Sequence, residues 1–300
     1  MIGFLWFKVF YSIYFCQGCL EKAKVAWNRC FKKLGGKPRL KGRRRPLNSV
    51  PFPDPIKTLE ANRVSLLKIG KLKYHKQVLP KGKIKCARLI KRASGWHLCL
   101  FIDAFKKPIQ RKSSGQVGID PGFKNLLTLS TGEKIRHPRE LEQAAKRLAQ
   151  SQRGHNKQLT SRIHERIANQ KKDRNHKLSL KLVENFTEIY FSKDNIKGIA
   201  NKFGKSVSSS NHYQLRQMLK YKSLTGGTKY VEVESKNSTL TCSKCKALTG
   251  PTGLAGLKVR HWECKACGAT HDRDVNAALN TLGVGAGRAL ESAVMARQET

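Results

Sequence analysis

Short runs of alternating apolar and polar residues mark the first third of the chain as strand-forming. Between residues 56 and 105 these runs read RVSLLKIG, LKYHKQVL, KIKCARLIKR and GWHLCLFIDAF, with Gly, Pro and Lys between them. Alternation over short segments is typical of β-strands with one buried face. Several short strands in succession predict a small antiparallel β-barrel or sheet, followed by the polar linker Lys106–Gly115.

Beyond residue 115 the pattern changes to buried strands and long helices. Val117–Asp120 is apolar and is followed by Pro-Gly, which predicts a buried strand and a turn. Apolar residues between 138 and 186 recur three and four positions apart, the period of a helix with one packed face. Shorter strands and helices are expected downstream, at Glu188–Ser192, Tyr213–Tyr221, Lys229–Glu234 and Val275–Leu282. Together these elements predict an α/β fold.

The charge balance restricts the kind of partner. Of 300 residues, 60 are Lys or Arg and 20 are Asp or Glu, which gives a formal net charge of +40. Such a surface is unlike that of a typical metabolic enzyme and predicts an extended polyanion as partner. Hydrophobic residues make up 39% of the chain, enough for a packed core, so wholesale disorder is not expected.

Two basic stretches are candidates for contact with that polyanion. KPRLKGRRRP has six Lys or Arg and no acid, and QKKDRNHK lies on a predicted helix. Each stretch alone is also compatible with a solvated surface. Taken together they predict a nucleic-acid surface, because basic side chains follow the phosphate backbone. The candidate residues are Arg39, Lys41, Arg43, Arg44, Arg45, Lys171, Lys172 and Arg174.

Four cysteines have the spacing of a metal site. Cys242 and Cys245 form one C-x-x-C pair, and Cys264 and Cys267 form a second pair after 18 intervening residues. Two such knuckles can surround one tetrahedral zinc ion, and with all four positions taken by protein the zinc would be structural. Two unrelated thiol pairs or a redox motif are the alternatives. The remaining pair, Cys16-x-x-Cys19, has no matching partner pair.

The first twenty residues are apolar and aromatic, but they do not fit a targeting segment. Lys8 interrupts the run, no basic region precedes it, and no A-x-A-like site follows it. The apolar stretch is also short for a spanning helix, which needs roughly 20 residues. We expect a core strand or helix here, no membrane association and a cytoplasmic location.

Two aspartates become candidate functional residues when the segments around them are considered. Asp120 closes an apolar strand, and Asp274 begins a helix just after the cysteine unit. Taken singly, the first is compatible with a turn residue and the second with a helix cap. However, GIDPGFKNLLTLSTGE, ERIANQKKDRNHKLSLKLV, NSTLTCSKC and CKACGATHDRDVNAALN occur in this order along the chain. In these segments, from about Lys57 to Asn280, the chain resembles the TnpB (OrfB) proteins of bacterial and archaeal insertion sequences, relatives of the type V CRISPR nucleases.

The resemblance implies a fold, a chemistry and a set of partners. The fold would be a RuvC-like nuclease domain of the RNase H type with an inserted zinc ribbon. Three carboxylates would hold Mg²⁺ and cut DNA by two-metal phosphodiester hydrolysis. The partners would be a guide RNA from the protein's own element and a target DNA, and a transposase encoded by the same element is a further candidate. The location would be the prokaryotic cytoplasm, in association with the nucleoid.

The domain organisation expected from pattern and resemblance has six parts. Only about fifty residues precede the strand region, so the amino-terminal part looks shortened relative to the family. The expected boundaries are 1–55 for a truncated basic and helical segment, 56–110 for a small wedge-like β-barrel, 111–237 for the main RuvC-like part, 238–270 for the zinc ribbon, 271–284 for the final RuvC-like segment and 285–300 for a mobile tail.

The resemblance also assigns the carboxylates residue by residue. The first family aspartate falls on Asp120, and the last falls on Asp274, with Asp272 as the alternative. The middle position is a glutamate in the family and falls on Ser192, while its acidic neighbour has become Lys193. The triad is therefore incomplete in this chain.

Two nearby acids are candidates to replace the missing glutamate. Glu188 lies four residues upstream, about 13 Å along a strand, too far to serve as a ligand of the same ion. Asp194 is two residues past Ser192 and points the same way if the strand continues. Serine is a weak neutral ligand and Lys193 adds positive charge, so two Mg²⁺ ions would be poorly compensated.

Three interpretations follow from this departure. The leading one is a transposon-associated, RNA-guided DNA-binding protein in which cleavage is impaired. The second is an active metal-dependent endonuclease with Asp194 as the substitute ligand. The third is a decayed transposon remnant, which the unusual amino terminus favours and the intact Cys242–Cys267 unit argues against.

Overall fold

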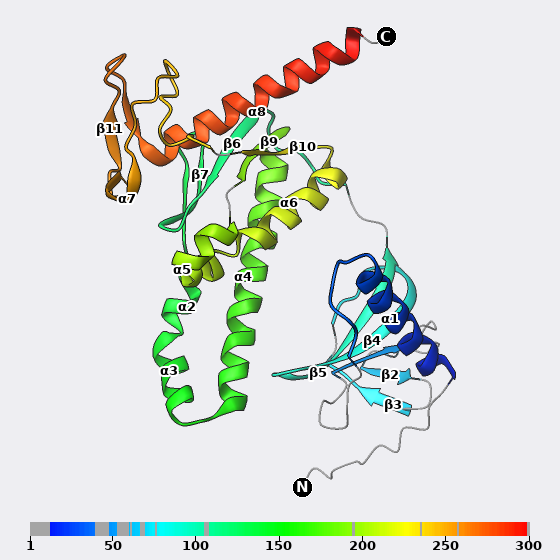
Figure 1. The fold of residues 1–300 in the computed structure, drawn as a ribbon. Coiled ribbons are helices and arrows are strands. Elements are labelled where there is room, and N and C mark those ends of the chain that lie inside the picture. Colours follow the sequence, from blue (N-terminus) through cyan, green and yellow to red (C-terminus); the bar gives the residue numbers. More distant parts are fainter. Residues whose placement is uncertain are drawn as a thin grey trace. The chain divides into compact units, whose positions relative to one another are not determined.

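The chain forms two compact units. They are Met1–Lys107 and Pro108–Thr300 (Figure 1). The computed structural model describes residues 13–39, 48–52, 60, 62–66, 70–75, 77–104, 108–193, 196–234, 236–256 and 258–298. In this part of the chain, no helix is both long enough and apolar enough to cross a membrane.

The first unit contains one helix and two small antiparallel sheets. Helix α1 (Ile13–Phe31) contacts β1 (Ser49–Phe52), which pairs with the long hairpin of β4 (Gly82–Arg92) and β5 (Gly95–Ala104). Strands β2 (Arg63–Leu66) and β3 (Gly70–Lys73) form the second sheet. Strands were expected in this region and are found there; the described strands form sheets of three and two strands, and closure into a barrel stays a prediction.

The second unit is built on a five-stranded mixed sheet. Its strand order is β10-β9-β6-β7-β8. Strands β6, β7 and β8 form an antiparallel meander, whereas β9 and β10 run parallel to β6. The bounds are β6 Gln116–Pro121, β7 Asn125–Leu129, β8 Lys134–Arg136, β9 Glu188–Lys193 and β10 Lys229–Glu234. The unit is a mixed α/β structure, as the pattern of hydrophobic positions predicts.

Helices cover one face of this sheet through an apolar core. Leu182 of α4 and Leu219 of α6 pack with Val117 and Ile119 of β6 and with Phe191 of β9. Burial of these side chains is the main favourable contribution to the stability of the unit. The helices between the strands are α2 (Glu140–Gln143), α3 (Ala145–Arg153), α4 (Lys157–Asn185), α5 (Ile196–Ser210) and α6 (His212–Gly226).

A buried histidine ties the start of α6 to the sheet. The ring nitrogen Nε2 of His212 lies 3.0 Å from the carbonyl oxygen of Leu126 in β7. Burial lowers the pKa of His212 to about 4, so the ring is neutral near pH 7 and donates this bond. The contact fixes the start of α6 against β7.

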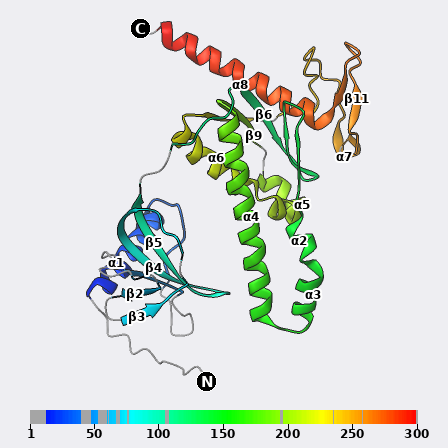
Figure 2. The same cartoon turned by 180° about the vertical axis from the view of Figure 1, so that it is seen from behind.

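The opposite face of the sheet is covered by α8 (Arg273–Gln298), as the two views in Figures 1 and 2 show. The helix lies very close to β6, because a Cβ added to Gly118 would lie 2.1 Å from the carbonyl oxygen of Ala278. About two turns further on, Gly285 lies against the ring of Tyr190. The backbone is helical to Gln298, and the Ala, Leu, Glu and Arg of this stretch are good helix formers. The mobility expected from residue 285 onward stays a prediction.

We predict that Gly118→Ala unfolds or displaces α8. The new methyl group would overlap the backbone of α8 at Ala278 and Leu282, which cannot move away as a flexible side chain could. The expected loss is about 3 kcal/mol or more in the free energy of unfolding, measured by urea denaturation.

The matched control is Gly287→Ala in α8, where no atom lies within 4 Å of an added Cβ. This change should leave stability unchanged or raise it by about 1 kcal/mol, because Ala has the higher helix propensity. Equal stability of the two variants would contradict the close approach of α8 to β6.

Candidate functional site

One row of residues crosses the five strands on the face beneath α8. Val233 pairs with Ser192, Asp120 pairs with Thr128, and Thr128 pairs with Lys134. Strands β6 and β9 are in register up to Ile119 and Phe191, so the next step places Asp120 beside Ser192. Adjacent strands lie about 4.8 Å apart. The sheet therefore brings the first and middle positions of the predicted triad together.

The start of α8 is fixed over this row by Asp272. Its Oδ2 atom lies 2.5 Å from Nζ of Lys134, the last member of the row. Its Oδ1 atom accepts hydrogen bonds from the backbone N–H groups of Asp274 and Val275, at 3.2 and 3.1 Å, and so caps the helix. Burial works to raise the pKa of Asp272, but the hydrogen bonds from Lys134 and Val275 hold it below its usual value.

Asp274 has a different environment from Asp272. Its carboxylate lies 3.4 Å from Nη1 of Arg260, and no other ion pair is present for it in the described part of the chain. Because Asp272 is committed to capping and to Lys134, the geometry favours Asp274 as the carboxylate of α8 available to a ligand. Asp274 lies in the first turn of α8, which packs on β6, the strand that carries Asp120.

Ser192 is the unusual member of the row. Its side chain is 1% exposed, and its hydroxyl has no hydrogen-bond partner among the described residues. The neighbouring Lys193 is exposed, and Asp194 lies outside the described residues. Glu188, at the other end of β9, accepts a hydrogen bond from the Tyr190 hydroxyl and lies beside Lys229 at 3.8 Å. It is therefore remote from the row, as its position in the sequence predicts.

The four cysteines converge as their spacing predicts. All four Sγ atoms lie within 4.8 Å of one another, with Cys242 and Cys267 at 3.8 Å and Cys245 and Cys264 at 3.6 Å. A hydrogen bond from the Thr249 hydroxyl is the main cause that lowers the pKa of Cys264, to about 6, which favours the thiolate. One metal ion could be held by this set of sulfur atoms.

The two knuckles share one backbone geometry. In each, the N–H of the first cysteine donates to the carbonyl five residues later, at 2.8 Å, and the residue after the second cysteine donates back. That residue is Lys246 in one knuckle and Gly268 in the other, with φ of 66° and 67°. The left-handed backbone suits Gly268 and is tolerated at Lys246, so two different sequences form the same turn.

Two asparagines connect the cysteine unit to α8, and sequence reasoning missed both. Asn276 is 1% exposed; its amide donates to the carbonyl of Thr241 at 2.8 Å, and its Oδ1 accepts from the N–H of Ser243 at 2.8 Å. Asn280, one turn later, donates to the carbonyls of Ser238 and Thr241. Two Asn four residues apart on a helix of small apolar residues are the signal in the sequence for this contact.

The basic candidates divide between surface and interior. Arg39 and Lys172 are exposed, whereas Lys41, Arg43, Arg44 and Arg45 lie outside the described residues. Lys171 is 7% exposed and donates to the carbonyl of Ser208 at 2.8 Å. Arg39 and Lys172, the two exposed side chains, stay candidates for nucleic-acid contact.

Arg174 is used inside the fold. It pairs with the buried Glu140 at 2.8 Å and donates to the carbonyl of Ser210 at 2.9 Å. Burial lowers the pKa of both Lys171 and Arg174. The structure therefore places these two on the packed side of α4, where they hold α2 and the end of α5, rather than on a nucleic-acid surface.

Two family models match this chain. One, described as "Probable transposase", matches residues 105–202, and the other, described as "Cas12f1-like, TNB domain", matches residues 212–281. The first covers the meander, α4 and the start of α5, and the second covers α6, β10, the cysteine unit and the start of α8.

Named relatives are similar over most of the chain. A Streptomyces pristinaespiralis protein named "Putative RNA-guided DNA endonuclease" is 29% identical over 289 residues, covering 90% of this chain and 70% of the relative. "Putative RNA-guided DNA endonuclease InsQ" of Escherichia coli K12 is 24% identical, covering 90% and 73%. A solved structure titled "Cryo-EM structure of the Cas12f1-sgRNA-target DNA complex" matches with a TM-score of 0.42 at 16% identity, covering 90% of this chain and 78% of that one.

We predict that Asn276→Ala detaches the first knuckle from α8. The change leaves the N–H of Ser243 without its partner in a partly buried position, and it removes one of the two donors to the carbonyl of Thr241, which Asn280 still contacts. The expected loss is about 3 kcal/mol in the free energy of unfolding, measured by urea denaturation. Leu279→Ala, at a partly exposed position of the same helix, should cost less than about 1 kcal/mol. Similar losses for the two variants would show that the asparagine contacts add nothing to stability.

Proposed function

Because the chain belongs to the TnpB (OrfB) family of insertion-sequence proteins, we propose that it is an RNA-guided DNA-binding protein with impaired cleavage. The names of its relatives support RNA and DNA as partner classes. The guide would come from the protein's own element, and a transposase of the same element is a further candidate partner. The five-stranded sheet between α8 and the pair α4 and α6 supports a RuvC-like domain of the RNase H type.

One observation supports the proposal that cleavage is impaired. The position beside Asp120 in the row is Ser192, which is buried and neutral, and its hydroxyl has no partner in the described structure. Asp120 and Asp274 remain as the two carboxylates of the site. Lys193 and Arg260 add positive charge next to the row, whereas the charge of Lys134 is compensated by Asp272.

This set of residues does not fit a pair of magnesium ions. Mg²⁺ requires oxygen ligands in near-octahedral geometry and is usually bound through carboxylates. Two ions would bring four positive charges to a site with the carboxylates of Asp120 and Asp274 and with Lys193 and Arg260 nearby. Without a third carboxylate, the charge of the two Mg²⁺ ions would be poorly compensated. The site is therefore poorly suited to two-metal cleavage of DNA.

The cysteine unit, by contrast, fits a structural zinc ion. Zn–S bonds of about 2.3 Å in a tetrahedron place the sulfur atoms about 3.8 Å apart. The pairs at 3.8 and 3.6 Å are close to this separation, and all four sulfur atoms lie within 4.8 Å of one another. All four ligand positions are taken by cysteine, so the ion would hold the two knuckles together and through Asn276 would support the start of α8.

We predict that Ser192→Glu restores cleavage by at least about 100-fold, because one added carboxylate at a metal site contributes several kcal/mol to transition-state stabilisation. The assay uses the full chain with the RNA transcribed from its own locus, a matching DNA target and Mg²⁺, and scores binding and cutting separately. Ser192→Gln is the matched control, since it has the same size without the charge and should bind without cutting.

Cutting by the unaltered chain would contradict the proposal. Asp194→Asn would then test whether Asp194 is the substitute ligand. Failure of every form to bind the guided target would favour the decayed remnant.

We predict one zinc ion per chain, measured by elemental analysis of the purified protein. Cys264→Ser should lose the metal and unfold at a lower temperature, because the binding free energy of a structural zinc contributes to folding. Cys99→Ser, in β5 of the first unit, should keep the metal. A metal-free native protein with unchanged thermal stability would rule out this role.

A further inference from the structure

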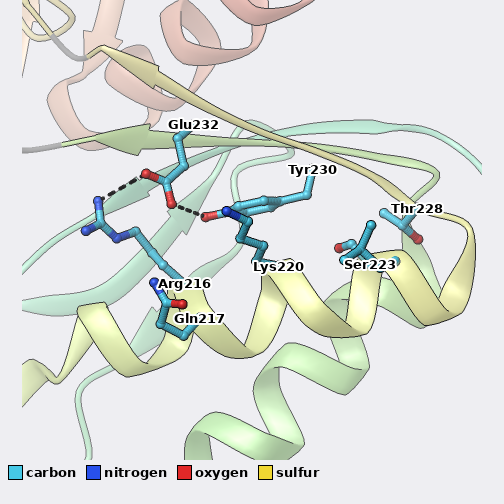
Figure 3. Close-up of a pocket in the computed structure, with 8 residues that line it drawn as sticks. Arg216, Gln217, Lys220, Ser223, Thr228, Tyr230 and Glu232 are labelled. Atoms are coloured by element: carbon cyan, nitrogen blue, oxygen red, sulfur yellow. Dashed lines mark hydrogen bonds and ion pairs between the residues drawn. The ribbon is translucent and has the colours of Figure 1, made fainter. Parts of the chain in front are cut away.

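A groove lies on the other side of the sheet from Asp120, between α6 and the edge strand β10 (Figure 3). Val233 belongs to the row beneath α8, so its neighbour Glu232 faces the opposite side, toward α6. The groove has a volume of about 500 Å³. Its lining residues are Arg216, Gln217, Lys220, Ser223 and Leu224 of α6, Thr228 of the connection, and Tyr230 and Glu232 of β10.

The carboxylate of Glu232, the acidic group of this groove, already has partners on both of its oxygen atoms. One carboxylate oxygen of Glu232 lies 3.6 Å from Nη1 of Arg216, and the other accepts a hydrogen bond from the Tyr230 hydroxyl at 3.2 Å. Figure 3 shows both contacts at the left end of the groove. Burial and the nearby Glu232 raise the pKa of Tyr230, so its hydroxyl keeps the proton that it donates.

Several hydrogen-bond donors of the groove remain unused. Within the described part of the chain, Nε of Arg216 and the hydroxyl of Ser223 have no hydrogen-bond partner, although both are buried. The exposed Lys220 is in no ion pair with any described residue. A groove with spare donors, a lysine ammonium and no spare carboxylate suits an anion whose oxygen atoms only accept hydrogen bonds.

The exposed side of α6 indicates what kind of anion fits. Tyr213, Gln217, Lys220 and Leu224 follow each other at spacings of four, three and four residues, so they form one stripe. Tyr213 is 62% exposed and Leu224 is 81% exposed. The stripe is about 16 Å long at 1.5 Å per residue, longer than a single phosphate group. Exposed aromatic and basic side chains along one line are typical of surfaces that bind single strands.

We infer that this groove binds the phosphodiester backbone of a single nucleic-acid strand, with one phosphate on Lys220 and the Ser223 hydroxyl. The inference rests on the proposed function only for the class of partner. The groove itself is separate from the carboxylates, since it lies on the other face of the sheet. It gives the chain a strand contact that does not depend on Asp120, Ser192 or Asp274.

The test measures binding of the full chain to labelled oligouridylate RNA and to oligothymidylate DNA of about 15 nucleotides, by fluorescence anisotropy, without guide, target or magnesium. Lys220→Gln should weaken binding about fivefold and lower the slope of log K against log salt by about 0.7, the value for one phosphate contact on a single strand. Lys177→Gln is the matched control, because Lys177 is exposed on α4 and already pairs with Asp173 at 2.7 Å. It should change neither quantity.

Ser223→Ala separates a ligand contact from a general effect of charge. The folded chain leaves this hydroxyl unpaired, so its removal should keep or raise the melting temperature. If the strand uses the hydroxyl, the same variant should bind about threefold more weakly.

A loss on RNA, on DNA or on both supports the groove and identifies the strand that it takes. Unchanged binding of Lys220→Gln and Ser223→Ala would overturn the inference, as would equal losses for Lys220→Gln and Lys177→Gln. Displacement of the oligonucleotide by polyglutamate from the unaltered chain but not from Lys220→Gln would assign the groove to an acidic peptide instead. Because no guide or metal is present, failure here leaves the cleavage result for Ser192→Glu independent.

Discussion

The close contact between α8 and strand β6 is the constraint on which the second unit depends. Gly118 has no side chain, and the helix presents Ala277 and Ala278, both fully buried, at the same place. Any larger side chain at Gly118 would push the helix off the sheet. Asp274 lies one turn before this contact, so its distance from the sheet depends on how closely the backbones of α8 and β6 approach.

The cysteine unit belongs to the same arrangement. Asn276 and Asn280 attach it to α8, and Asp272 attaches the start of the helix to Lys134 of β8. A metal ion in the four-cysteine cluster would therefore stabilise the carboxylate region without being part of its chemistry. This coupling links the four-cysteine unit directly to the helix that carries Asp274.

The large positive charge of the chain is used in two ways. Part of it is internal, since Arg174 pairs with Glu140 and Lys171 binds a backbone carbonyl. Charged groups in such places are retained only with partners, because desolvation is costly. Part of it is outward, as at Lys220 in the groove of α6 and β10. The two faces of the sheet thus carry different groups: carboxylates and a buried serine beneath α8, and unused donors beside α6.

Much of this organisation can be predicted from the sequence by itself. Local signals suffice for the strands of the first unit, the Val117–Asp120 strand with its turn, α4, and the paired cysteines, because periodicity and ligand spacing act over a few residues. The assignment of Ser192 to the family's glutamate position likewise comes from the sequence alone, through the resemblance, and stays a prediction. Only the tertiary structure decides that Asp120 and Ser192 are neighbours, that Asp272 caps while Asp274 does not, and that Lys171 and Arg174 are internal. Those outcomes depend on strand register and on which side of a helix is packed, and both are set by contacts between residues far apart in the chain.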